Sequence, residues 1–306
     1  MVSWEMIYNI DAMKKIFIPF CAVLFFSCCT GKLQQSEISV SDEVTICAYT
    51  ESSAKSRTII DDSTLDISWT ASDAINVFFG ASESSRFVTS DSGDVAEFKG
   101  SVDVVTGGGE GLNDKTSLWG IYPYDENNTC DGENVYLTLP AVQPSAENTF
   151  AMGLFPQIAR SQNFYMSFYN LCACFRFSVS NPDIKWVTLS GNSGEQIAGK
   201  VKVSMETVPV VEEILVGEKQ LKMYAPEGGC FKSGVHYYFV LYPMTFQEGL
   251  TITYYKENTY ASYTYPNAYT LGRGKISRFA DKDAGLTFVP SPLVDWEEGD
   301  HVSGEI

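Results

Sequence analysis

The sequence predicts an all-β protein made of about two β-sandwich domains. Short segments alternate between apolar and polar residues along most of the chain, and Gly, Pro, Asn and Asp separate them. No segment keeps the 3.6-residue period of an amphipathic helix over three turns. The length of 306 residues suggests two domains of roughly 130–150 residues, each able to bury a core.

The N-terminal segment has the pattern of a secretory signal. Two lysines precede a short apolar run at residues 16–26, which falls short of the roughly 20 residues needed to span a bilayer. A serine then precedes Cys28, and a small residue directly before a cysteine resembles a bacterial lipoprotein signal. We therefore expect residues 1–28 to form the signal and Cys28 to carry the lipid. Cys29 is the alternative lipid site, and an ordinary secretory signal that is cut elsewhere stays open.

A polar tether is predicted at residues 29–42, and a first sandwich at residues 43–167. The sandwich begins with an alternating strand at residues 43–50. A loop of small and polar residues follows this strand and ends at Arg57. Further strands are expected at residues 65–69, 74–79, 86–89, 96–100, 118–123 and 135–140.

A second sandwich is predicted at residues 168–306. An aromatic-rich segment at residues 164–179 marks the junction, which we expect between residues 164 and 171. The tail at residues 286–306 carries two apolar pieces interrupted by prolines. Strands of this half are expected at residues 186–189, 197–203, 221–224, 236–242, 250–255 and 260–265.

The composition excludes some partners. A net charge of −17 repels nucleic acid and anionic lipid headgroups. After the signal, no run is long and apolar enough to cross a membrane, so a lipid would be the only anchor.

Cys172 and Cys174 share one face of an apolar strand and cannot easily pair, so we expect them to be small buried hydrophobic residues.

Catalytic and metal-binding motifs are lacking in the sequence. The chain has two histidines, His236 and His301, and no Gly-x-Ser-x-Gly motif. His236 alternates with aromatic residues, which favours a structural role over a role as a base. No second cysteine or histidine pair has metal-ligand spacing, and residues 125–133 lack the glycine of an EF-hand loop. We therefore expect no catalytic residue, no metal and no cofactor.

One acidic cluster leaves two interpretations open. It lies around Trp69, and a glycosidase would need two such carboxylates held across a sugar. The simpler interpretation is a solvated turn on an acidic surface. The cluster consists of Asp61, Asp62, Asp66 and Asp73.

Eight short motifs follow one another along nearly the whole chain. They are KSRT at residues 55–58, ISWTASDAINVF at 67–78, AEFKG at 96–100, IYPY at 121–124, LPAVQ at 139–143, FYNLCACFRF at 168–177, YYFVLYP at 237–243 and VDWEEG at 294–299. In this order they resemble the fimbrillin family of Bacteroidales, which comprises type V pilins and fimbrillin-like lipoproteins. The resemblance implies two tandem transthyretin-like β-sandwich domains after a lipoprotein signal.

The resemblance also implies a function. It indicates a structural or accessory subunit of a cell-surface fimbria, anchored by palmitate-type lipidation to the outer membrane. An arginine-specific protease would trigger strand exchange with other fimbrial subunits, and the fimbria would support adhesion to surface glycans or proteins. The alternative is a surface glycan-binding lipoprotein that does not polymerise, and a secreted hydrolase is less favoured by the missing motifs.

Two sets of residues follow as candidates for assembly. Cleavage after Arg57 would detach the strand at residues 43–50, although a plain surface arginine is equally compatible with the sequence. The donor strand is expected in the tail at Leu293, Val294 and Trp296, which could fill a vacated groove. Alternatively, the tail completes the second sandwich of its own chain.

Overall fold

The computed structural model describes residues 40–51, 67–81, 83–104 and 117–291. In these ranges the chain forms short strands and a single turn of 3-10 helix, η2 (Pro226–Gly228). The predicted all-β class is therefore confirmed. None of the described residues forms a helix long and apolar enough to cross a membrane.

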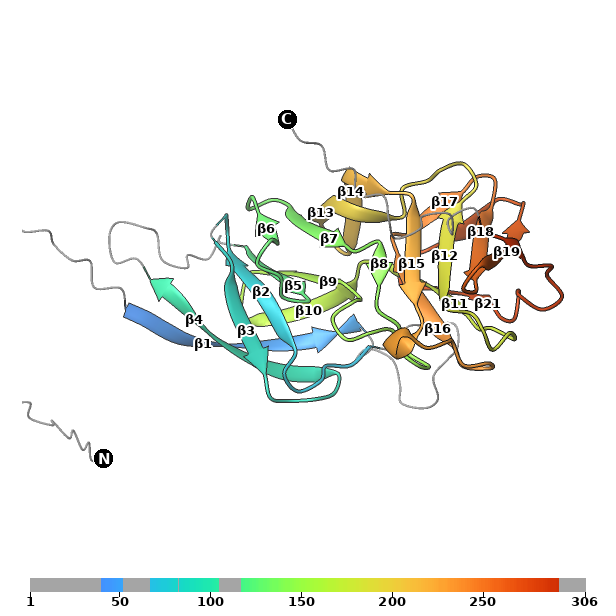
Figure 1. The fold of residues 1–306 in the computed structure, drawn as a ribbon. Coiled ribbons are helices and arrows are strands. Elements are labelled where there is room, and N and C mark those ends of the chain that lie inside the picture. Colours follow the sequence, from blue (N-terminus) through green and yellow to red (C-terminus); the bar gives the residue numbers. More distant parts are fainter. Residues whose placement is uncertain (1–39, 52–66, 82, 105–116, 292–306) are drawn as a thin grey trace, which may run out of the picture. The chain divides into compact units, whose positions relative to one another are not determined.

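The first sheet is a closed barrel that contains the N-terminal strand β1 (Figure 1). β1 lies between β10, to which it is parallel, and β4, to which it is antiparallel. The strand order is β1 (Val40–Thr50), β10 (Tyr165–Asn170), β9 (Gln157–Ser161), β5 (Leu118–Tyr122), β2 (Ala74–Phe79), β3 (Ser85–Thr89) and β4 (Val95–Val104).

The remaining described strands form four further sheets. The largest has the order β22 (Val289–Pro290), β19 (Thr259–Tyr265), β18 (Leu250–Tyr255), β12 (Trp186–Gly191), β15 (Gln220–Tyr224) and β8 (Val142–Gln143). A second has the order β14 (Pro209–Glu218), β13 (Ala198–Met205), β7 (Val135–Leu139) and β6 (Thr129–Cys130). The others are β16 (Tyr237–Leu241), β11 (Ala173–Phe177) and β21 (Ile276–Phe279), and the pair β17 (Met244–Phe246) and β20 (Tyr269–Leu271).

Strand β5 separates two hydrophobic cores, and all five of its residues are buried. Its side chains alternate between two faces. Leu118 and Tyr122 join the core inside the barrel, whereas Trp119 and Ile121 join the larger core formed by the later strands. This burial on both faces explains why the segment has a nearly continuous apolar sequence.

The chain passes from the barrel to the later sheets between β10 and β11. Two earlier strands also pair with later ones: β7 with β13, and β8 with β15. The pairing therefore crosses residue 168. The division into sandwiches at residues 43–167 and 168–306, and their transthyretin-like topology, stay predictions.

Several sequence expectations can be compared with this fold. Cys172 and Cys174 are buried and unpaired, as expected, and burial raises the pKa of both thiols. Asp73 differs from the solvated turn that was expected, because it is only 7% exposed. Its carboxylate accepts hydrogen bonds from the Tyr122 hydroxyl (3.0 Å) and the Thr70 amide (2.8 Å), which offset its burial. The other three acidic residues of that cluster lie outside the described ranges.

Candidate functional site

Strand β1 is held along its length by backbone pairing. Its register with β4 runs from Val40 opposite Val104 to Tyr49 opposite Val95. On the other side, the amide of Cys47 donates to the carbonyl of Phe164 at 2.8 Å, next to the parallel pairing with β10. β1 therefore bridges two strands that do not pair with each other in the sheet order.

The inward side chains of β1 complete the barrel core. Ile46 and Ala48 are fully buried, and Thr50 is 2% exposed. Alternation places these three residues on one face, as the sequence predicted for this segment. Fully burying a side chain the size of isoleucine contributes about 1.5–3 kcal/mol, so β1 has a substantial apolar attachment as well as its ladder.

Trp69 occupies the centre of this core and contacts β1 directly. Its indole Nε1 donates a hydrogen bond of 3.2 Å to the carbonyl of Ala48. The ring packs edge-on at 5.0–5.4 Å between centroids against three other aromatic residues, namely Phe98, Tyr122 and Phe168. The packing of the tryptophan therefore depends on β1 being in place.

The end of β1 is fixed by an ion pair to a distant turn. The guanidinium of Arg273, which lies between β20 and β21, donates to both carboxylate oxygens of Glu51 at 2.7 and 2.8 Å. Arg273 also donates to the backbone carbonyl of Asn170 at 2.7 Å, and the backbone amide of Asn170 donates to the Glu51 carboxylate at 3.0 Å. Both charged side chains are less than one-third exposed. This two-pronged geometry is the stronger form of an arginine–carboxylate contact.

The base of the C-terminal tail lies on the edge of the largest sheet. Val289 and Pro290 of β22 pair with Tyr260 and Thr259 of β19. The amide of Ser291 donates to the carbonyl of Asn258 at 2.9 Å. The described base of the tail therefore pairs with a strand of its own chain.

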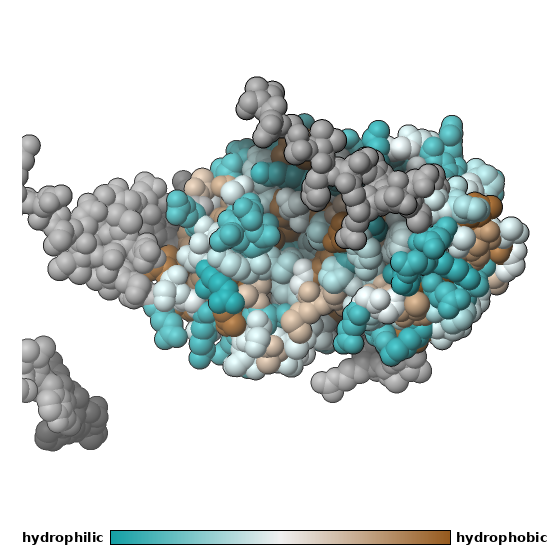
Figure 2. Space-filling view, viewed as in Figure 1, coloured by the Kyte–Doolittle hydropathy of each residue, from teal (hydrophilic) through white to brown (hydrophobic). Residues whose placement is uncertain are grey.

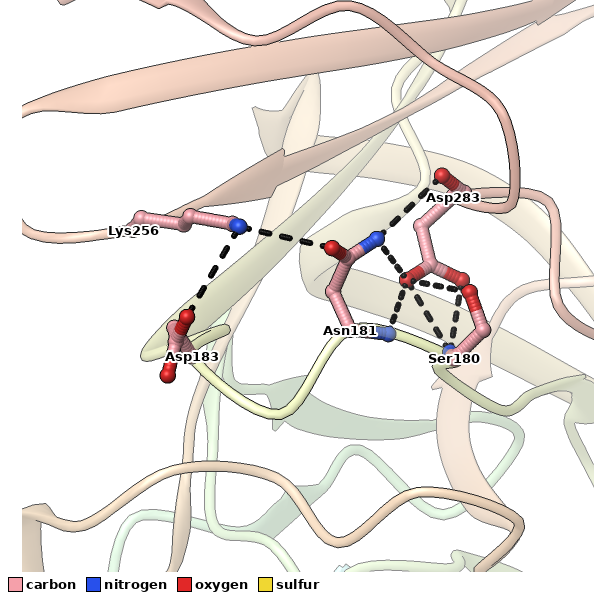
Figure 3. Close-up of polar contacts among 5 residues, drawn as sticks. All are labelled: Ser180, Asn181, Asp183, Lys256 and Asp283. Carbon is pink, nitrogen blue, oxygen red and sulfur yellow. Dashed lines mark hydrogen bonds and ion pairs between the residues drawn. The ribbon is translucent and has the colours of Figure 1, made fainter.

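A buried carboxylate fixes the turn from which this tail departs (Figure 3). Asp283 is fully buried and accepts hydrogen bonds from the backbone amides of Ser180 and Asn181 and from both of their side chains, at 2.7–3.0 Å. Lys256 donates to Asn181 Oδ1 at 3.3 Å and lies 4.4 Å above the ring of Phe288. These hydrogen bonds hold the turn against the loop after β11. Lys256 connects the tail residue Phe288 to the same cluster.

The residues predicted for lipidation, cleavage and donation lie outside the described ranges. They are Cys28, Arg57, Leu293, Val294 and Trp296. Arg57 belongs to the connection at residues 52–66, which follows Glu51 directly in the sequence. No sequence pattern links Glu51 to Arg273, because 222 positions separate the two residues.

Of the two histidines, His236 lies within the described ranges. His236 precedes β16, and its backbone exchanges hydrogen bonds with Asn148 at 2.8 and 3.3 Å. Its Nδ1 atom is buried without a hydrogen-bond partner. Within the described ranges, no group of three histidine, cysteine, aspartate or glutamate residues could hold a metal ion.

Comparisons with known proteins give structural neighbours only. No family model and no curated protein sequence matches the chain. A candidate cell adhesion protein from Bacteroides ovatus is 12% identical and covers 82% of this chain and 96% of its own, with a TM-score of 0.47. A fimbrial assembly protein from Parabacteroides distasonis is 11% identical and covers 82% of this chain and all of its own, with a TM-score of 0.39.

A third neighbour is the tip fimbrial protein Mfa3 from Porphyromonas gingivalis, solved with a C-terminal truncation. It is 8% identical and covers 82% of this chain and 99% of its own, with a TM-score of 0.37.

Proposed function

We propose that this chain is a structural or accessory subunit of a surface fimbria that assembles by protease-triggered strand exchange and supports adhesion. The observation that carries the proposal is the position of β1. It is a barrel strand with buried side chains, and the connection that contains Arg57 follows it directly in the sequence. The proposed role is structural and not enzymatic.

Removal of β1 would create a groove suited to another strand. The facing backbone groups of β4 and β10 would lose their partners, and the space filled by Ile46 and Ala48 would open. The indole of Trp69 would also lose its acceptor on Ala48. An open sheet edge beside an apolar slot binds an added strand through backbone hydrogen bonds, and alternate side chains supply specificity.

The tail beyond Ser291 is the proposed donor. Its first piece pairs with β19 of its own chain, so the donor begins after that anchor. In an extended strand, Val294 and Trp296 point to the same face because they are two residues apart. They would occupy the positions of Ile46 and Ala48, and Leu293 would lie on the other face. Because the contact joins one subunit head-to-tail to the next, its repetition would build a filament.

Export and anchoring complete the proposal. Residues 1–28 would direct secretion, and Cys28 would carry the lipid that holds the precursor at the outer membrane. A protease that recognises arginine would cut after Arg57 and free β1 from its covalent link to the barrel. The filament would then reach its adhesion partners, which are surface glycans or proteins.

The test follows polymer formation after limited proteolysis. We expect the protein cut after Arg57 to form ladders in denaturing gels and filaments in negative-stain micrographs. The Arg57→Ala variant should remain monomeric under the same treatment, and so should a chain lacking residues 292–306. Ladders from either variant would contradict the proposed cleavage site or donor, respectively. A cut protein that stays monomeric and binds surface glycans would favour the non-polymerising alternative.

A further inference from the structure

The outer face of the largest sheet carries an aromatic row that crosses four strands. These strands, β15, β12, β18 and β19, lie side by side (Figure 1). Register places one aromatic residue of each strand opposite the next, in the order Tyr224, Trp186, Tyr255 and Tyr260. The alternate residues of β12, Val187 and Leu189, are fully buried on the opposite face. The aromatic row therefore lies on the side of the sheet that faces away from the core.

Two neighbouring pairs of rings in this row are nearly parallel. Trp186 and Tyr255 are 5.0 Å apart between centroids at an interplanar angle of 13°, and Tyr255 and Tyr260 are 5.8 Å apart at 25°. Neighbouring strands lie about 4.7–4.9 Å apart, so these rings stand side by side at close to the strand spacing. At the end of the row, Tyr224 is 49% exposed and its ring lies 46° from that of Trp186.

Two parallel rows of polar side chains continue this face. Thr253 and Ser262 share a hydroxyl contact of 2.9 Å, and Thr251 and Thr264 share another of 2.9 Å. Thr188 and Thr253 lie deep in the face, at 4% and 9% exposure. Register places in the first row Lys222, Thr188, Thr253 and Ser262, and in the second Gln220, Ser190, Thr251 and Thr264.

The composition of the three rows is unusual for this chain. Within these four strands they contain no carboxylate and no aliphatic side chain, although the protein has 38 acidic residues and a net charge of −17. On the edge strands, register adds one exposed valine to each of two rows, Val142 opposite Lys222 and Val289 opposite Tyr260. The one charge of the three rows is Lys222, whose Nζ lies 4.4 Å from the ring centre of Tyr224. Cross-strand aromatic and threonine pairs stabilise any sheet. Stability alone, however, does not require a ring that is half exposed or a face without carboxylates.

From this combination we infer that the outer face of β15, β12, β18 and β19 binds a neutral oligosaccharide. A pyranose ring presents C–H groups on its faces, which pack on aromatic rings, and hydroxyl groups on its rim, which exchange hydrogen bonds with serine and threonine. Aromatic residues are enriched in protein interfaces too, but there they occur with methionine and arginine, whereas serine is depleted. The three rows contain neither methionine nor arginine, and two of them consist mainly of serine and threonine. An anionic glycan would be repelled by the acidic chain around it.

Titration calorimetry and tryptophan fluorescence of the full-length protein test this inference. The probes are the β-1,4-linked hexasaccharides of glucose, mannose and xylose, with hexagalacturonate as the anionic comparison. We expect at least one neutral probe to bind and to change the emission of Trp186, a change that Trp186→Phe removes. Tyr224→Ala should weaken binding about tenfold, since it removes one exposed ring contact. Tyr165→Ala, which removes a 66% exposed tyrosine from the barrel, is the matched control and should leave binding unchanged.

Four results would overturn the inference. They are no binding to any neutral probe, equal binding by Tyr224→Ala, binding of hexagalacturonate alone, and binding only after residues 292–306 are deleted. The last result would mean that the chain's own tail occupies the face. If Tyr224→Ala fails to fold, the fluorescence comparison of the parent protein with Trp186→Phe decides the question. All of these measurements use uncut protein, so they are independent of polymer formation.

Discussion

Glu51, at the end of β1, and Arg273, in the turn between β20 and β21, form a two-pronged ion pair at 2.7 and 2.8 Å. The same guanidinium holds the carbonyl of Asn170, the last residue of β10. One side chain from the C-terminal half therefore fixes the ends of two neighbouring barrel strands. In the proposed assembly this contact would oppose the release of β1.

Loss of this contact should make β1 easier to displace. We expect Glu51→Ala to lower the free energy of unfolding by about 1–2 kcal/mol, the range for hydrogen bonds to charged groups that are partly exposed. It should also speed polymer formation by the protein cut after Arg57. Glu257→Gln is the control, because its pair with Lys185 is well exposed and should contribute little. Equal effects of the two substitutions on chemical denaturation would argue against a special role for Glu51.

Truncating Ile46, a buried side chain of β1, should lower the stability of the monomer but not that of the polymer. Ile46→Ala removes a fully buried side chain and should cost the uncut protein about 2–5 kcal/mol of stability. If a donor strand replaces β1, the polymer no longer uses Ile46, so its resistance to denaturant should match the parent polymer. A polymer weakened as much as the monomer would show that β1 stays in its groove.

The buried carboxylate at the base of the tail should be essential for stability. Asp283→Ala leaves the amides of Ser180 and Asn181 without their acceptor, and we expect a loss of at least about 3 kcal/mol. Asp183→Asn is the matched control in the same cluster. Its side chain is 72% exposed and its contact with Lys256 measures 3.9 Å, so thermal unfolding should change little. Equal losses of stability from Asp283→Ala and Asp183→Asn would show that the burial of Asp283 does not cause the effect.

Acid should weaken the turn between β6 and β7. Burial opposes ionisation of Asp131, but hydrogen bonds from the Tyr136 hydroxyl and from the amides of Asn134 and Glu133 outweigh it and lower its pKa from 3.8 to about 2. The folded-state pKa is depressed, so this contribution is present above about pH 4 and is lost as the pH falls towards 2. The stability difference between the parent and Asp131→Asn should shrink over that interval in denaturant titrations. A stability difference between the parent and Asp131→Asn that persists at pH 2 would show that the effect comes from the shape of the side chain and not from its charge.

The sequence predicted local structure better than long-range contacts. An apolar, β-branched run that ends at Gly80 located β2 at residues 74–79, and a strand-like segment that ends at Pro140 located β7 within residues 135–140. The edge strand β14 was not predicted, since it has exposed residues on both faces and lacks clean alternation. Pairings such as β7 with β13 depend on which distant strands share a core, which one sequence does not specify.

The candidate site was predictable only in part. The inward face of β1 followed from alternation at residues 43–50, and Ile46 and Ala48 are buried there. The Glu51–Arg273 pair and the aromatic row both join residues from distant strands. The aromatic residues become neighbours through strand register, which a single-residue slip would change. Cys28, Arg57 and the tail residues Leu293, Val294 and Trp296 stay predictions.

An engineered disulfide between β1 and β4 would hold β1 in place reversibly, and the strand register provides a position for it. Cys47 lies opposite the exposed residue Glu97 of β4. The Cys47 amide donates towards β10, so the pair with β4 is of the non-hydrogen-bonded kind, with α-carbons about 4.5 Å apart. That spacing lies within the range that a disulfide bridges. Glu97→Cys should therefore join β1 to β4 under oxidising conditions.

The most direct measurement is polymer formation by Glu97→Cys protein cut after Arg57, with and without reductant, and with Glu97→Ser as the control. The account predicts no ladders while the disulfide holds β1 in place, and ladders at the parent rate once it is reduced. Glu97→Ser should polymerise in both conditions. Equal polymerisation of the oxidised and reduced Glu97→Cys protein, with the disulfide confirmed by mass spectrometry, would contradict strand exchange at β1.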